Sequence, residues 1–169
     1  MKEVAINYAL SVIAILAIFY KLFSCGYLDS YDLYTKTFRH YFFTAFLAIG
    51  SFIFTLMTAV LFSMKERVYD NKKYRLDYVE HRESGKNSQP LYEPLVNIGR
   101  LFIFTVTVCM ITSVEQITIG LVANNFVAAL GFSLAVSTIL LIVYVLKNVK
   151  YTMERWFVIL EQWTEADDK

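Results

Sequence analysis

The chain has little charge, few cysteines and few prolines. Only 18% of its 169 residues are charged, whereas soluble domains carry about 25%, so an ordinary soluble domain is disfavoured. We expect Cys25 and Cys109 to lie at depths about 15 Å apart, too far for a disulfide bond. Neither cysteine belongs to a CxxC motif, which leaves no sign of a metal or redox site.

Catalytic motifs are also missing. The sequence contains no GxSxG, HExxH or GxxxxGK[ST] pattern, and we expect His40 and His81 on opposite sides of a membrane. The basic residues of the middle loop, Lys65 to Glu83, alternate with acidic ones, which disfavours direct nucleic-acid binding. We therefore predict a non-enzymatic protein without a cofactor.

Long apolar runs dominate what is present. Hydrophobic residues make up 57% of the chain, and four runs approach or exceed the roughly 20 residues that cross a bilayer as a helix: Val4–Phe23, Tyr41–Met64, Val96–Leu121 and Phe126–Leu146. The sequence predicts an all-α, polytopic integral membrane protein. Its four-helix transmembrane domain would cover residues 1–146, with a loop at 65–95, and a tail helix would follow at 147–169.

The positive charges predict the orientation. Of 16 Lys and Arg residues, 13 lie in the N-terminus, the middle loop with Arg100, or the tail. By the positive-inside rule, both termini and the middle loop face the cytoplasm. We expect a bacterial inner membrane protein in contact with membrane lipids.

Small residues recur at helical spacing in the spans. One set, the small-residue stripe, shares a face of the second span: Ser51, Thr55, Ala59 and Ser63. Gly131 and Ala135 repeat the spacing in the fourth span. Such residues let helices approach closely, either within one subunit or at a subunit contact or pore lining.

The tail carries an apolar seam. Its residues follow the 4-3-4-3 spacing of a helix with one apolar face: Val149, Met153, Trp156, Leu160 and Trp163. No proline or glycine separates Leu146 from this tail seam, so the fourth span can continue as one helix. The seam needs a cover, either the membrane surface or a contact with a cytosolic protein or another copy, and we favour the protein contact.

Glu115 is an ionisable residue inside an apolar run, and such a residue is a candidate functional site. It lies about 9 Å from the outer end of the third span. We expect an interfacial or hydrogen-bonding role with Asn124 or Asn125 as partners. Lining an oligomer's outer vestibule and coupling to protons or ions are the alternatives.

The whole architecture resembles that of small four-span membrane proteins of bacterial anti-phage systems. The matching features are a charged loop after the second span, the short turn Leu121-Val-Ala-Asn-Asn125, and an inward tail that begins Lys147-Asn-Val-Lys-Tyr-Thr-Met-Glu-Arg-Trp156. The Kiwa membrane component is the first such family, and the resemblance implies a homo-oligomeric sensor that engages a cytosolic partner. The Rex membrane component is the second, and it implies an ion-conducting effector.

Together these features predict an oligomeric sensor or scaffold of phage defence in the inner membrane. It would form a homo-oligomer, with a tetramer as one option, and dock a cytosolic protein through the tail seam. The alternatives are an ion-conducting, depolarising effector, which Glu115 and the small-residue stripe would serve, and an exclusion or immunity protein.

Overall fold

The computed structural model describes residues 1–25, 30–85, 90–122 and 124–167, and the side chains of residues 30, 77 and 162–167 lie outside the description. The described chain is all-α, as predicted. Its helices are α1 (Lys2–Ser24), α2 (Ser30–Leu33), α3 (Arg39–Met64), α4 (Lys72–Glu83), α5 (Glu93–Ile117) and α6 (Asn125–Asp167). Single helical turns join some of them: η1 (Tyr34–Phe38), η2 (Lys65–Tyr69) and η3 (Ile119–Leu121).

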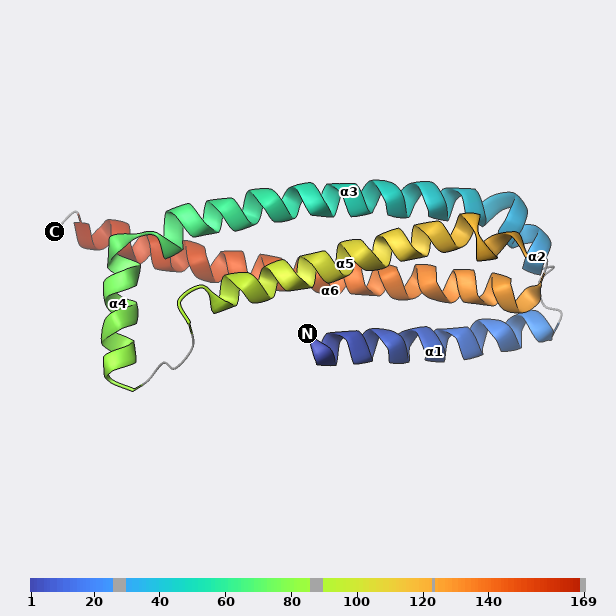
Figure 1. The fold of residues 1–169 in the computed structure, drawn as a ribbon, viewed down its shortest axis with the longest axis horizontal. Helices are drawn as coiled ribbons and strands as arrows, with labels where there is room; N and C mark the ends of the chain where they lie inside the picture. Colours follow the sequence, from blue (N-terminus) through green and yellow to red (C-terminus); the bar gives the residue numbers. More distant parts are fainter. Residues whose placement is uncertain (26–29, 86–89, 123, 168–169) are drawn as a thin grey trace.

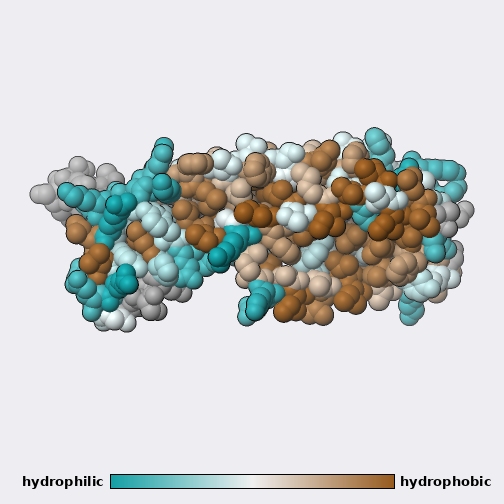
Figure 2. Space-filling model, viewed as in Figure 1, coloured by the Kyte–Doolittle hydropathy of each residue, from teal (hydrophilic) through white to brown (hydrophobic). Residues whose placement is uncertain are grey.

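Four segments are long and apolar enough to cross a membrane: Lys2–Ser24, Tyr31–Tyr69, Glu93–Leu121 and Asn125–Glu161. They run alongside one another, while α4 stands across the bundle at one end (Figure 1). We call this end the α4 end and the opposite end, where α2 lies, the α2 end. On the face shown in Figure 2, apolar side chains cover most of the bundle and hydrophilic ones gather at both ends, most extensively at the α4 end. This arrangement confirms the predicted multi-pass membrane protein.

Two of the segments are nearly twice as long as a bilayer requires. The segments that contain α3 and α6 have 39 and 37 residues, whereas about 20 residues cross the hydrocarbon. α6 runs unbroken from Asn125 to Asp167, as the absence of proline and glycine after Leu146 predicts. α1 is shorter, and its N-terminus lies about midway along the bundle (Figure 1). The α4 end is therefore an extension of α3, α5 and α6 beyond α1.

The end of the third span differs from the expected one. α5 ends at Ile117 rather than Leu121, and the 3₁₀ turn η3 follows, so Glu115 lies in the last helical turn. α3 ends at Met64, as expected, and η2 follows it to Tyr69, after which the chain turns at Asp70. Asn71 then caps α4, because its side-chain oxygen accepts a hydrogen bond from the Lys73 N–H at 2.9 Å.

Three apolar clusters hold the helices together. The central one contains Ile53, Phe102, Val108, Leu141, Val145 and Val149. At the α2 end, Phe132 contacts the rings of Phe19, Phe23, Tyr34, Phe38 and Phe42. At the α4 end, Val60, Met64, Val68 and Tyr69 form the third cluster.

Polar side chains in the bundle interior bond to one another across helices. The Thr138 hydroxyl lies 2.9 Å from that of Thr112 and 3.2 Å from that of Tyr8, which links α6 to α5 and α1. Ser113 donates to the Phe43 carbonyl at 2.9 Å, which links α5 to α3. Such pairing is needed where water is excluded, because a polar group without a partner in hydrocarbon is costly.

Candidate functional site

Glu115 lies inside the bundle at the α2 end, where three polar side chains form a buried chain. Its side chain is 6% exposed, and both Gln116 and Tyr34 are fully buried. The Tyr34 hydroxyl donates to Gln116 Oε1 at 2.7 Å, and Gln116 Nε2 donates to Glu115 Oε2 at 2.6 Å. Glu115 Oε1 is buried and has no hydrogen-bond partner among the described residues. We call these three residues the polar chain.

The position of Tyr34 depends on two glycines. A Cβ atom at Gly131 would lie 2.5 Å from the Tyr34 hydroxyl oxygen, and one at Gly120 would lie 2.7 Å from it. The Arg39 side chain passes Gly120 as well, with its Cδ 3.6 Å from the same hypothetical Cβ. The π-helical turn η1, which contains Tyr34, therefore packs directly onto the backbone of α6 and η3.

The expected partners of Glu115 were wrong. Asn124 instead caps α6, because its side-chain oxygen accepts a hydrogen bond from the Phe126 N–H at 2.9 Å. The hydrogen-bonding role itself is observed, but Gln116 provides it. Burial of Glu115 in its own bundle also argues against the vestibule between subunits. The sequence gave little sign of Tyr34, because 82 positions separate it from Gln116.

Replacing Tyr34 with phenylalanine should destabilise the bundle. The change leaves Gln116 Oε1 without its donor in a buried site, which typically costs about 1–3 kcal/mol. We expect a lower apparent unfolding temperature of the protein in detergent. Tyr20→Phe is the matched control, because Tyr20 is 49% exposed. Equal unfolding temperatures for both variants would contradict this role of Tyr34.

The tail seam packs in part against the chain itself, a contact that the sequence interpretation did not include. Met153, Trp156 and Leu160 pack against the cluster of Val60, Met64, Val68 and Tyr69, and Val149 is buried in the central cluster. The Trp163 side chain lies outside the described residues. α3 and η2 extend alongside α6 and cover part of the seam, while Met153, Trp156 and Leu160 stay partly exposed. Contact of the seam with a partner stays a prediction.

An aromatic cluster formed by Tyr69, Tyr74, Tyr92 and Trp156 stabilises this contact. The Tyr69 ring centroid lies 5.1 Å from that of Trp156 and 5.2 Å from that of Tyr74. The Tyr92 ring centroid is 5.7 Å from that of Tyr69. Pairs in this range contribute about 0.5–1.5 kcal/mol beyond the burial of their area. The cluster therefore joins η2, α4 and the start of α5 to α6.

A polar network closes the same end. Asp70 Oδ1 accepts hydrogen bonds from the Tyr92 hydroxyl at 2.8 Å and from Arg75 Nη2 at 2.7 Å. The Tyr92 hydroxyl and then Arg75 lower the pKa of Asp70 below its usual value. The network stabilises the fold above the pKa of an unfolded aspartate, and this contribution is lost as the pH falls through the lowered pKa. It is therefore intact at neutral pH.

The small-residue stripe does not pack inside the chain. Its four members, Ser51, Thr55, Ala59 and Ser63, are all exposed. The face of α3 that contacts other helices instead contains Phe46, Gly50, Ile53, Val60 and Met64. Packing within one subunit is therefore wrong for the stripe, whereas contact with another subunit stays a prediction.

The other small residues do pack inside the chain. Ala135 is fully buried, and Gly131 meets Tyr34. Cys109 is also fully buried, and its Cβ would lie 3.2 Å from a Cβ at Gly50. It therefore acts as a small packing residue between α3 and α5.

Several large apolar side chains at the α4 end are exposed among the described residues. Phe157 is 61% exposed and Val158 is 53% exposed on α6, while Leu76 on α4 is 65% exposed. Sequence reasoning missed them because it assigned the tail's contact surface to the seam. The signal that could have found Phe157 and Val158 is that they are apolar residues of the tail helix outside the 4-3-4-3 positions of the seam.

The apolar helices, the internal pairing of polar groups and the hydrophilic α4 end define a multi-pass membrane protein. The chain matches no protein-family model, no curated protein and no solved structure.

Proposed function

We propose that this chain is a non-enzymatic component of bacterial phage defence that docks a cytosolic protein from the inner membrane. The phage-defence assignment comes from the resemblance of the architecture to small four-span defence proteins. The distribution of Lys and Arg supports an orientation with both termini and α4 in the cytoplasm. In this orientation the α4 end is the part that a soluble protein can reach.

The observation that carries the docking proposal is the position of exposed apolar residues on a packed extension. Phe157 lies 32 residues beyond the start of α6, about 48 Å along the helix, whereas the hydrocarbon is about 30 Å thick. Phe157 and Val158 therefore lie beyond the bilayer. The aromatic cluster and the Asp70 network hold the extension together, so Phe157 and Val158 lie on a folded surface. Leu76 adds an exposed apolar side chain on α4.

The exposed stripe on α3 supports the homo-oligomer. Small side chains on a lipid-facing surface allow close approach of a second helix. The hydroxyls of Ser51 and Thr55 already donate to carbonyls of their own helix at 2.9 Å and 3.1 Å, so the face holds no unpaired donor from these two. It is therefore suited to helix contact. The ion-conducting alternative has weaker support, because Glu115 is enclosed in its own bundle.

The docking proposal predicts that Phe157→Glu combined with Val158→Glu removes the partner. Affinity purification of the full chain from native membranes should yield a cytosolic protein with the wild type, and at least about tenfold less with the variant. A tenfold loss of binding corresponds to about 1.4 kcal/mol, which two exposed apolar residues at a contact can contribute.

The matched control exchanges the charges of an exposed ion pair on the same helix, Lys150→Glu with Glu154→Lys, whose side chains are 3.7 Å apart. This control should retain the partner, and both variants should keep the wild-type unfolding temperature. Purification of the same proteins with the double glutamate variant as with the wild type would refute docking at this surface.

A further inference from the structure

One face of α6 borders open space both in the membrane interior and at the α4 end. Two cavities lie along it. The first, of about 190 Å³, lies between α1 and α6 and is lined by Val4, Asn7, Tyr8, Ser11, Ser137, Leu140, Leu141 and Tyr144. The second, of about 400 Å³, lies at the α4 end and is lined by Tyr74, Pro94, Ile98, Tyr151, Thr152, Arg155, Trp156 and Ile159.

The α6 residues of both cavities share one helical face. Positions 137, 141, 144, 148, 151, 155 and 159 follow the three- and four-residue steps of a single stripe. α1 faces only the first part of this stripe, because its N-terminus lies about midway along the bundle (Figure 1). The two cavities thus lie in succession along this face, and we call the stretch that includes both the α6 groove.

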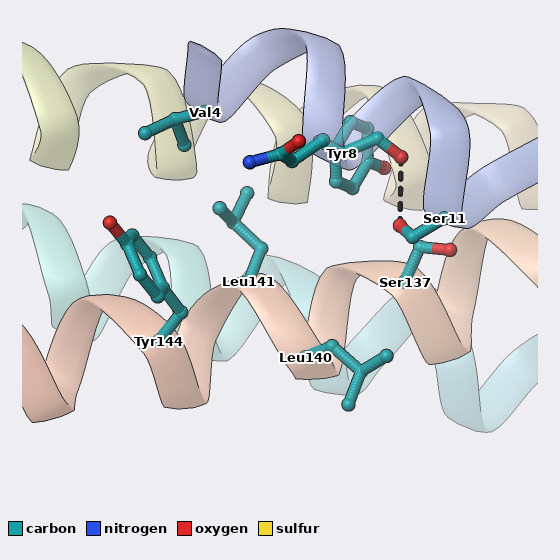
Figure 3. Close-up of a pocket in the computed structure, with 8 residues that line it drawn as sticks. Val4, Tyr8, Ser11, Ser137, Leu140, Leu141 and Tyr144 are labelled. Atoms are coloured by element: carbon teal, nitrogen blue, oxygen red, sulfur yellow. Dashed lines mark hydrogen bonds between the residues drawn. The ribbon is translucent and has the colours of Figure 1, made fainter.

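The first cavity is lined by apolar and polar side chains. Val4, Leu140 and Leu141 are apolar, whereas Asn7, Ser11 and Ser137 are polar. Val4 and Tyr144 face each other from α1 and α6, and Leu141 lies beside them on the side of Tyr8 (Figure 3). Asn7 lies one turn further along α1, within the apolar segment Lys2–Ser24, and its side chain makes no hydrogen bond to another described residue. A side-chain amide inside the membrane needs a partner.

Two basic residues, Lys147 and Arg155, lie on α6 along the part of the groove toward the α4 end. Arg155 is exposed and its guanidinium carbon lies 5.9 Å from the centroid of the Tyr151 ring. Arg155 forms no ion pair among the described residues. Lys147 lies between Tyr144 and Tyr151 on the same side of α6. The neighbouring carboxylate, Glu154, is 3.7 Å from Lys150 instead. Two positive charges thus lie on the α4 side of Val4, Leu140, Leu141 and Tyr144, which we call the apolar slot.

We propose that the α6 groove binds one anionic phospholipid from the leaflet on the α4 side. Lys147 and Arg155 bind the phosphate, because polybasic positions just beyond a membrane helix attract anionic headgroups. The Asn7 amide donates to an oxygen of the ester region, about one helical turn deeper. An acyl chain lies between Val4, Leu140, Leu141 and Tyr144. A second copy of the chain fits less well, because a helix would leave both charges without a counter-ion.

The test uses the full chain in a neutral detergent. Phosphatidylglycerol should raise the unfolding temperature and appear as a one-lipid adduct in native mass spectrometry, whereas phosphatidylcholine with the same acyl chains should do neither. Glycerol phosphate, which lacks the chains, should also have no effect. An equal shift with phosphatidylcholine, or an equal shift with glycerol phosphate, would overturn the proposal.

Two variants test the two parts of the groove. Lys147→Ala with Arg155→Ala should weaken phosphatidylglycerol binding at least about tenfold, whereas Lys150→Ala, on a neighbouring face, should not. Leu140→Trp should fill the apolar slot and also reduce the adduct; Leu140 is 54% exposed, so the fold tolerates the change. Unchanged adducts in both variants would overturn the site. A change in oligomeric mass without a change in lipid would assign the groove to a second copy instead.

Discussion

Replacing Gly131 with alanine should lower the unfolding temperature of the protein by about 4–8 °C. The new Cβ would lie 2.5 Å from the Tyr34 hydroxyl oxygen and 2.7 Å from two ring carbons, distances at which something must move. Tyr34 cannot move easily, because it is fully buried and bonded to Gln116. Overpacking of this kind costs about 1–3 kcal/mol, and about 2 kcal/mol gives this shift for a chain of this size.

The matched control is Gly99→Ala, a glycine in α5 whose new Cβ would meet only the end of the Leu61 side chain, at 3.3 Å. Leu61 can rotate, and alanine is the better helix former by about 1 kcal/mol, so this variant should be neutral or slightly stabilised. Adding Tyr34→Phe to Gly131→Ala removes the closest atom, so the two changes should cost less together than the sum of each alone. Strict additivity, or equal effects of the two glycine changes, would show that Tyr34 does not press on α6.

Replacing Trp156 with alanine should unfold the α4 end while the transmembrane bundle stays folded. Trp156 contacts the rings of Tyr69 and Tyr74 at centroid distances of 5.1 Å and 5.7 Å. Truncating a buried tryptophan costs about 3–5 kcal/mol, and about 2–3 kcal/mol is expected for this half-buried side chain. Trypsin should therefore cleave within α4 and the adjacent loop at least about tenfold faster.

Phe157→Ala is the control for this experiment, since the neighbouring side chain is 61% exposed. Exposed substitutions usually change stability by less than about 0.5 kcal/mol, so its cleavage rate should match that of the wild type. Circular dichroism should show that both variants keep the helical content expected of a folded transmembrane bundle. Equal protease resistance of Trp156→Ala and Phe157→Ala would mean that the aromatic cluster does not hold the extension together.

Sequence patterns predicted the membrane helices well, because the bilayer imposes a simple rule on them. An apolar run of sufficient length needs an internally bonded helix, and no long-range contact decides that outcome. The unbroken α6 followed from the same local reasoning, since nothing after Leu146 interrupts a helix. The end of α5 was missed by a few residues, because the turn after Ile117 is apolar and looks like a continuing span.

The candidate site could not be predicted in the same way, because it depends on which helix faces meet. The tail seam had the spacing of a contact surface, but the sequence did not say that α3 and η2 would extend far enough to cover part of it. The small-residue stripe had the spacing of a buried face, yet Gly50, Ile53 and Val60 occupy that face. Tyr34 and Gln116 come from distant segments, so their pairing with Glu115 follows only from the packing of η1.

The continuity of α6 has a mechanical consequence. Phe132, near one end, is surrounded by rings of α1, η1 and α3, and Trp156, near the other, contacts η2 and α4. About 36 Å of unbroken helix separates these two residues, and the backbone bonds along it resist bending. By geometry alone, a tilt of about 5° at Phe132 would displace Trp156 by about 3 Å.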